Sequence, residues 1–232
     1  MELLKGKPVA DLIKKGIAEK AEALIERNVV PTLGILRVGD NESDVAYENS
    51  AVKTAGTLGI HVEKYIMDAK SSEDDVLEVL KVMNEDENIH GILMFRPLPA
   101  HIDEDRVRNH IAPVKDIDGI SDASVGSLFT GNRVGFPPCT AEAAMSILDY
   151  YGVELSGKKA VVIGRSLVVG KPAAMMLLEK NATVTVCHSR TAAGDLEELC
   201  KAADIIVSAA GKINAIAVSY THLRAHETLS DL

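Results

Sequence analysis

The sequence has only three cysteines, no excess of positive charge and no long apolar run. Cys139, Cys187 and Cys200 lack the spacing of a metal site, and their odd number is typical of reduced thiols in a cytoplasmic protein. The formal net charge of −9 argues against nucleic acid or an anionic membrane surface as the main partner. No apolar run approaches a membrane span, and the first residues do not read as a signal peptide. We therefore expect a cytoplasmic protein with no metal site.

The composition is that of a soluble globular protein, with 47% hydrophobic and 25% charged residues in a chain of 232. This length accommodates one large or two small domains. Apolar patterning predicts strands at 32–38, 60–67 and 91–95, and a helix that begins in a capping box at 72–75. Between 111 and 138 the pattern gives way to loops. Repeated βα units of this kind predict a mostly parallel sheet covered by helices.

A glycine-containing turn at 164–172, Gly-Arg-Ser-Leu-Val-Val-Gly-Lys-Pro, follows a short apolar strand and is the most informative motif. Gly164 permits a tight turn and the close approach of a ligand, Gly170 permits close helix packing, and Pro172 suits a first helical turn. Free N–H groups at that helix start would receive a phosphate. Ser166 stands where the ordinary dinucleotide fingerprint has glycine, and the spacing is not that of a Walker loop. Taken alone, the motif fits a plain tight turn equally well.

A second apolar strand, at 182–186, is followed by Ser189 and Arg190. In dinucleotide-binding folds the end of the second strand meets the adenine ribose. An acidic residue there selects a free 2′-hydroxyl, whereas an arginine accommodates a 2′-phosphate. Arg165 lies in the first turn, and the first carboxylate after the strand is Asp195. This pattern favours NADP over NAD, the alternative being a solvated basic turn.

Seven segments in a fixed order identify a family. They are residues 3–8, the helix around Tyr47, 91–93 with 97–99, 115–119, 138–140, 164–166 with 169–172, and 187–191. With these segments the chain resembles the bifunctional methylenetetrahydrofolate dehydrogenase/cyclohydrolase family from residue 1 to about 216.

The resemblance implies NADP-dependent oxidation of methylenetetrahydrofolate to the methenyl form, followed in most members by hydrolysis to formyltetrahydrofolate. Folate nitrogen lone pairs push a hydride onto nicotinamide, so positioning supplies most of the catalysis. The implied fold is two-domain α/β, with a folate-binding catalytic domain at 1–139 and a truncated Rossmann-type NADP-binding domain at 140–216. The family is usually a homodimer.

Particular residues acquire roles through the same resemblance. Tyr47 lines and orients the folate, and Asp118 hydrogen-bonds the pterin ring, because a carboxylate accepts two parallel N–H bonds from an aminopyrimidine edge. Without the resemblance, half-buried packing is the favoured reading of Tyr47, whereas for Asp118 a turn residue ahead of Gly119 is only the alternative. The pocket wall is shaped by Pro97, Leu98 and Pro99. The cofactor-binding residues are Gly164, Arg165, Ser166, Gly170, Ser189, Arg190, Gly211 and Ile216.

The chain departs from the family where the hydrolysis step is concerned. The family has Lys four residues after the tyrosine and Gln before the Pro-Leu-Pro turn, and here those positions are Ala51 and Phe95. That pair is held to activate water, so the cyclohydrolase step is doubtful while hydride transfer persists. Arg96 is a candidate substitute cation, although neighbouring strand residues face opposite sides. Smaller departures are Ser124 for Asn and Ala141 for Pro.

A further departure follows residue 216, where residues 217–232 look like an in-frame translation of a transposase sequencing adapter. We interpret this tail as non-native and expect the chain as given, without the family's last loop and helix, to be unstable and inactive. Two other functions stay open: a folate/NADP-binding protein without turnover, and another Rossmann dehydrogenase acting on an amino acid or shikimate-type substrate. The folate-side segments argue against the latter.

Overall fold

The computed structural model of the protein describes residues 4–132 and 134–210, which divide into two compact units. The first-sheet unit contains Asp11–Ser127 together with 132 and 134–136. The second-sheet unit contains 4–10, Leu128–Gly131 and 137–210. Helices α1 (Gly6–Ile25) and α5 (Asp122–Thr130) each carry residues of both units.

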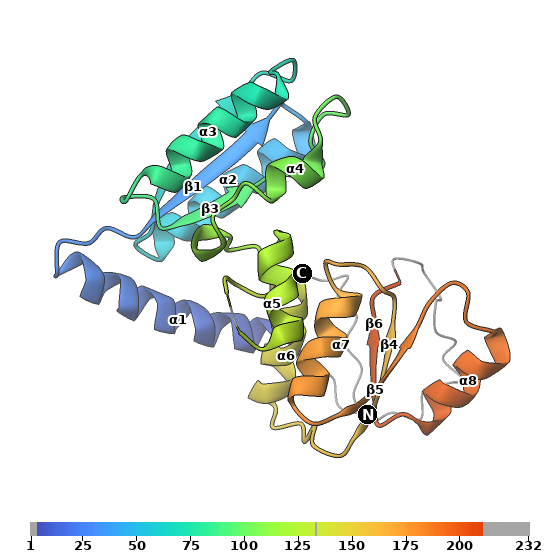
Figure 1. Ribbon diagram of the computed structural model, residues 1–232. Helices are drawn as coiled ribbons and strands as arrows, with labels where there is room; N and C mark the ends of the chain where they lie inside the picture. Colours follow the sequence, from blue (N-terminus) through green and yellow to red (C-terminus); the bar gives the residue numbers. More distant parts are fainter. Residues whose placement is uncertain (1–3, 133, 211–232) are drawn as a thin grey trace. The chain divides into compact units, whose positions relative to one another are not determined.

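The first sheet is parallel, with the strand order β2-β1-β3. Its elements are β1 (Thr32–Val38), α2 (Glu42–Thr57), β2 (His61–Met67), α3 (Glu73–Glu85) and β3 (Gly91–Met94). The crossover helices α2 and α3 cover opposite faces of this sheet (Figure 1). Successive side chains of a strand point to opposite faces, so Leu36 of β1 faces α3 while Arg37 faces α2.

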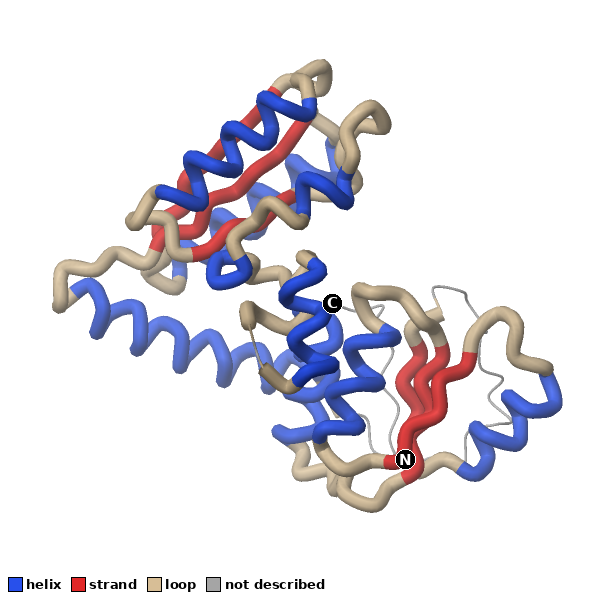
Figure 2. Tube along the Cα trace, in the orientation of Figure 1, coloured by secondary structure: helices blue, strands red, loops and turns tan. Residues whose placement is uncertain are grey.

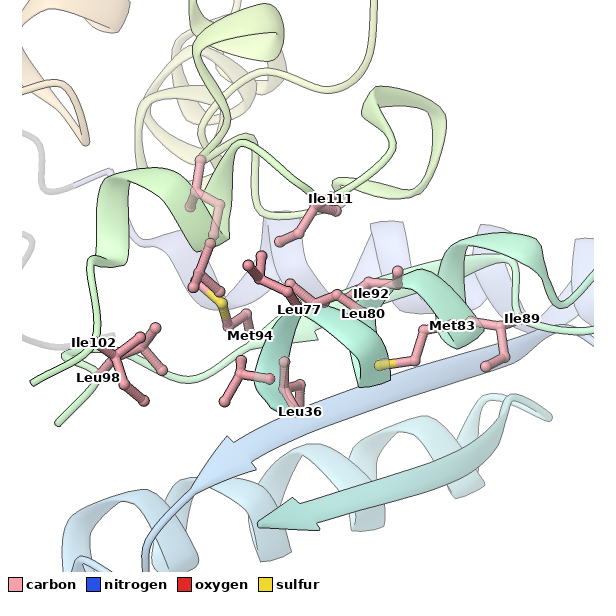
Figure 3. Packing of buried hydrophobic residues seen from close by; sticks show 13 residues of the cluster. Leu36, Leu77, Leu80, Met83, Ile89, Ile92, Met94, Leu98, Ile102 and Ile111 are labelled. Atoms are coloured by element: carbon pink, nitrogen blue, oxygen red, sulfur yellow. The ribbon is translucent and has the colours of Figure 1, made fainter. Parts of the chain in front are cut away.

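The core of this unit lies between the sheet and α3, where apolar side chains of both elements interdigitate (Figure 3). Leu80 and Met83 of α3 are completely buried, as is Leu36. The predicted capping box is confirmed, because the side chain of Ser72 accepts the Asp75 amide while Asp75 accepts the Ser72 amide. The helix therefore begins where the sequence predicts it.

After β3 the chain forms α4 (Glu104–Arg108), the 3-10 turn η1 (Pro113–Lys115) and then α5. The expectation of loops throughout 111–138 was therefore wrong for α5. The side chain of Ser121 accepts the Ser124 amide at 3.2 Å and caps the start of this helix. This helix has a weak apolar pattern and depends on contacts with residues distant in sequence, which local patterning does not reveal.

The second sheet is also parallel, with the order β5-β4-β6. Its strands lie side by side (Figure 2). Its strands are β4 (Lys159–Ile163), β5 (Thr183–Cys187) and β6 (Ile205–Ser208), and its helices are α6 (Cys139–Tyr150), α7 (Gly170–Glu179) and α8 (Ala193–Ala202). Alternate residues of β4 join different clusters: Val162 packs with α6 and α7, and Val161 packs with α8. Burial on both faces explains the continuous apolar run of this strand.

The α/β fold with two parallel-sheet domains is thus confirmed. In each sheet the first strand lies in the middle, and the next two strands of the chain lie on either side of it. The topological switch point therefore falls between β1 and β3 in one unit and between β4 and β6 in the other. Ligands of open α/β sheets bind outside the carboxyl ends of the strands at such points. No helix of the described residues is long and apolar enough to cross a membrane. The predicted division into 1–139 and 140–216 stays a prediction.

Candidate active site

An aromatic pair lies at the carboxyl end of the first sheet. Tyr47, on α2, has 60% of its surface exposed, and its ring meets that of Phe95 edge to face with centroids 5.4 Å apart. Phe95 itself is buried, and its amide donates to the Leu36 carbonyl at 2.9 Å, continuing the pairing of β3 with β1. The predicted folate-lining tyrosine is therefore accessible on one side and braced by Phe95 on the other.

Beside Tyr47, a buried ion cluster fixes α2 to the sheet. The two carboxylate oxygens of Glu48 accept from Arg37 Nε at 2.6 Å and from Lys64 Nζ at 2.7 Å. Burial by itself raises the pKa of Glu48, but the hydrogen bonds and charges of Lys64 and Arg37 outweigh it and lower the pKa. The carboxylate thus stays ionised at neutral pH. The sequence reasoning missed this cluster, because the strand residues that a helix glutamate meets are set by packing between elements.

Arg96 directly follows Phe95 and extends toward two carboxylates. Its Nη1 lies 3.7 Å from Glu104 Oε1, and its Nη2 lies 4.0 Å from Asp118 Oδ2. These separations exceed hydrogen-bond length, so the attraction is coulombic. The structure therefore places the candidate substitute cation beside the predicted pterin-binding Asp118.

The segment that carries Asp118 is organised by Asp116, which is completely buried. Its carboxylate accepts the amides of Ile120 at 3.1 Å and Ser121 at 2.8 Å. It also accepts the Ser124 hydroxyl at 2.7 Å, which gives this departure from the family a structural role. An isolated parallel bridge joins Ile92 of β3 to Asp116 and brings the segment to the sheet. Sequence reasoning overlooked Asp116, whose place ahead of a tight turn was the available signal.

The turn at 97–99 divides between core and surface. Pro97 is exposed and Pro99 half-buried, but Leu98 is buried and packs near Ile102 in the core cluster (Figure 3). The Leu98 amide donates to Glu104 Oε2 at 3.0 Å. Leu98 therefore anchors the turn, and the two prolines are the members of this wall that reach the surface.

In the second-sheet unit the turn after β4 requires its glycines. Gly164 has φ +123°, and a Cβ at this position would lie 2.5 Å from the Ala209 carbonyl oxygen after β6. A Cβ at Gly170 would collide with the backbone of Gly164 and Arg165. The close helix packing inferred at Gly170 is therefore present, between the start of α7 and the turn. At Gly164 the backbone after β6 makes the close approach, and the approach of a ligand there stays a prediction.

The amides at the start of α7 are engaged within the turn, and this corrects the expectation that they are free for a phosphate. The Ser166 hydroxyl accepts the amides of Val169 at 3.1 Å and Gly170 at 3.4 Å, while the Ser166 carbonyl accepts that of Lys171 at 3.0 Å. The expectation failed because Ser166 replaces the usual glycine with a side chain that satisfies these donors itself. The side-chain donors expected from the sequence are those of Arg165, Ser189 and Arg190.

Those side chains are on the surface of the same unit. Arg165, Ser189 and Arg190 are exposed, the last two in a turn after β5 that is closed by the Thr191 hydroxyl accepting the His188 amide at 2.9 Å. The Arg190 amide donates to His188 Nδ1 at 3.2 Å. The predicted cofactor residues Gly211 and Ile216, and the tail at 217–232, lie outside the described residues. Within 4–132 and 134–210, no three His, Cys, Asp or Glu side chains converge as a metal site.

Two family profiles match this chain. The family described as "Tetrahydrofolate dehydrogenase/cyclohydrolase, catalytic domain" matches residues 4–118, and that described as "Tetrahydrofolate dehydrogenase/cyclohydrolase, NAD(P)-binding domain" matches residues 138–226. The first match contains the aromatic pair and Asp118, and the second contains the glycine turn and Arg190.

Individual proteins agree with these matches. The bifunctional protein FolD of Alkaliphilus oremlandii is 48% identical over 210 residues, covering 90% of this chain and 73% of that protein. The crystal structure of FolD from Campylobacter jejuni superposes with a TM-score of 0.91 at 37% identity, covering 95% of this chain and 78% of that one. The FolD of Trypanosoma brucei, solved with NADP cofactor and an inhibitor, has a TM-score of 0.82 at 35% identity, covering 91% and 72%. The chain belongs to the tetrahydrofolate dehydrogenase/cyclohydrolase family.

Proposed function

We propose that this protein oxidises methylenetetrahydrofolate to methenyltetrahydrofolate with NADP as the hydride acceptor, as part of one-carbon metabolism in the cytoplasm. The observation that carries the proposal is that both family profiles match, each over the unit that holds the corresponding predicted residues. One relative is named a bifunctional protein, one solved relative a bifunctional enzyme, and another solved relative is a complex with NADP. NADP supplies the hydride acceptor, and the chain's residues bind and orient the two reactants.

In this proposal Tyr47 orients the folate and Asp118 accepts hydrogen bonds from the pterin, with Pro97 and Pro99 on the pocket wall. The exposed ring of Tyr47 and the partly exposed carboxylate of Asp118 support these roles. Arg165, Ser189 and Arg190 hold the 2′-phosphate of NADP, because they offer the charge and donors that a phosphate needs.

The second family activity, hydrolysis of the methenyl product, is weak in this proposal. Ala51 has no proton-handling group, and Phe95, whose ring contacts that of Tyr47, stands in the sequence where the family has a glutamine. We also propose a homodimer, in line with the family. Light scattering of the purified chain checks this, and a mass of one chain at micromolar concentration contradicts it.

The proposal is tested first by binding and then by turnover. Calorimetric titration of the full chain with NADP+ and with folic acid is expected to show saturable binding of each, and Asp118→Asn is expected to weaken only the folate. Reduction of NADP+ with methylenetetrahydrofolate is followed by absorbance. Failure to bind either ligand contradicts the proposal. Binding without turnover favours the non-catalytic alternative and the expectation that the chain as given is inactive.

A further inference from the structure

Arg96 and Asp118 form a charge pair whose position goes beyond the family pattern. The side chain of Arg96 is 25% exposed and that of Asp118 is 34% exposed, so a ligand can reach both charged groups. Arg96 is held on its other side by Glu104, whose second oxygen is fixed by the Leu98 amide at 3.0 Å. The guanidinium is therefore positioned by the turn on one side and directed toward Asp118 on the other.

A carboxylate and a guanidinium side by side present acceptors next to donors. The 2-amino-4-oxo edge of a pterin has the complementary order, with an amino group and a ring N–H that donate, followed by a carbonyl that accepts. A carboxylate by itself satisfies the two donors and leaves the carbonyl without a partner. The pair can therefore hydrogen-bond all three groups of the pterin edge, whereas Asp118 by itself can pair only the amino group and the ring N–H.

We propose that Arg96 is a specificity-determining residue that donates a hydrogen bond to the 4-carbonyl of the bound pterin while Asp118 accepts from the amino group and the ring N–H. This inference rests on the proposed function, since it deepens the same folate site. Glu104 positions the guanidinium. A 4-amino analogue replaces the carbonyl acceptor with a donor, which the Arg96 guanidinium repels, so the pair selects 4-oxo over 4-amino ligands.

The experiment measures dissociation constants of the full chain for folic acid and for its 4-amino analogue at neutral pH, where folic acid keeps its ring N–H and the ring of the free analogue is uncharged. Wild type is expected to prefer folic acid. Arg96→Leu is expected to lower this preference about tenfold or more, because a hydrogen bond from a charged donor is worth roughly that factor. The preference that remains in Arg96→Leu is due to Asp118, because the analogue has no ring N–H for its carboxylate to accept. Arg96→Lys is expected to keep part of the preference.

Arg106→Leu serves as the matched control, because Arg106 is exposed and pairs with Glu73 in the same unit. This variant is expected to leave the preference for folic acid unchanged. NADP+ affinity and circular dichroism report whether each variant is folded. A purely structural role for Arg96 weakens both ligands by the same factor. An unchanged preference in Arg96→Leu with folate binding retained therefore overturns the inference alone, whereas failure of wild type to bind either ligand overturns the proposed function as well.

Discussion

Phe95 packs edge to face on Tyr47, and the residue after it extends to Asp118, so two neighbouring residues contribute to the site in different ways. The apolar ring braces the tyrosine, and the guanidinium adds a cation beside the carboxylate. Phe95 stands where the family has the glutamine on which the hydrolysis step is expected to depend. The chemistry of this site therefore depends on which individual side chains stand at these positions of the family fold.

In a version of this protein completed with the family's last loop and helix, the double change Ala51→Lys with Phe95→Gln is expected to raise hydrolysis of methenyltetrahydrofolate by about 10²–10⁴, because it restores general acid–base groups. The decay of methenyl absorbance measures this. Lys53→Ala is the control, since Lys53 lies two positions from Ala51 and points elsewhere on the helix. Rapid hydrolysis by the unmodified protein would show that another group already assists water.

Arg190→Ala is expected to weaken NADP+ binding about 10- to 100-fold and leave NAD+ binding nearly unchanged, because the charged hydrogen bond to the 2′-phosphate is lost. Calorimetry with both cofactors measures the two affinities. Lys201→Ala, which removes the partner of Glu197 on α8, is the control and is expected to bind both like wild type. Equal losses for the two cofactors would contradict a 2′-phosphate role.

At the scale of secondary-structure elements, α2 is held on the sheet by charge as well as by apolar packing. Arg37 of β1 and Lys64 of β2 both reach Glu48, one residue after Tyr47. Lys64 is partly exposed, so the buried contact with Arg37 accounts for most of the stabilisation. The cluster thereby fixes the helix that presents Tyr47.

Glu48→Gln is expected to lower the free energy of unfolding by about 1.5–3 kcal/mol at neutral pH, since charged hydrogen bonds are lost. The folded-state pKa of Glu48 is below its ordinary value of about 4.5. The stabilisation is therefore complete above that value and lost as the pH falls through the lowered folded pKa, so wild type and variant converge in acid. Urea unfolding at several pH values measures this.

Glu78→Gln is the control for this change, because Glu78 and its partner Lys81 are both exposed. The free energy of unfolding of Glu78→Gln is expected to stay within about 0.5 kcal/mol of the wild-type value at every pH. If the two variants lose the same stability at neutral pH, the buried cluster does not hold α2 as described.

At the scale of the whole molecule, the same βαβαβ arrangement occurs in both units, with the first strand central in each sheet. The three cysteines report on one of them, the second-sheet unit. Cys187 and Cys200 are buried in the cluster where α8 packs on β4, whereas Cys139 is exposed at the start of α6. Their reactivities therefore measure whether α8 is seated on the sheet.

Burial raises the pKa of both the Cys187 and Cys200 thiols, so each forms thiolate less readily than an exposed cysteine. Titration with a chromogenic disulfide at mildly alkaline pH is expected to show one fast thiol, with the others slower by a factor of about 100 or more, and three in denaturant. Cys139→Ser is expected to abolish the fast phase. Two or three fast thiols in the native protein would mean that α8 is not packed as described.

The sequence by itself determined the features that depend on neighbouring residues. The strand at 32–38 and the capping box at Ser72 are found at the predicted places, and the glycines at 164 and 170 are required by the backbone. The ordered family segments also predicted the two-domain α/β fold. The strand and the capping box were predictable because apolar periodicity and helix capping act over a few consecutive residues, and Gly164 because its positive φ is a local property of the turn.

Only the tertiary structure decided which distant groups meet. It placed Arg96 beside Asp118, joined Glu48 to Arg37 and Lys64, and buried Asp116 under the start of α5. It also showed that the Ser166 hydroxyl accepts hydrogen bonds from the amides at the start of α7. These contacts depend on strand register and on how helices lie across a sheet, and each hydrogen bond or ion pair needs its two groups within a few ångström. No pattern along the chain specifies such separations, because they are set by packing between elements.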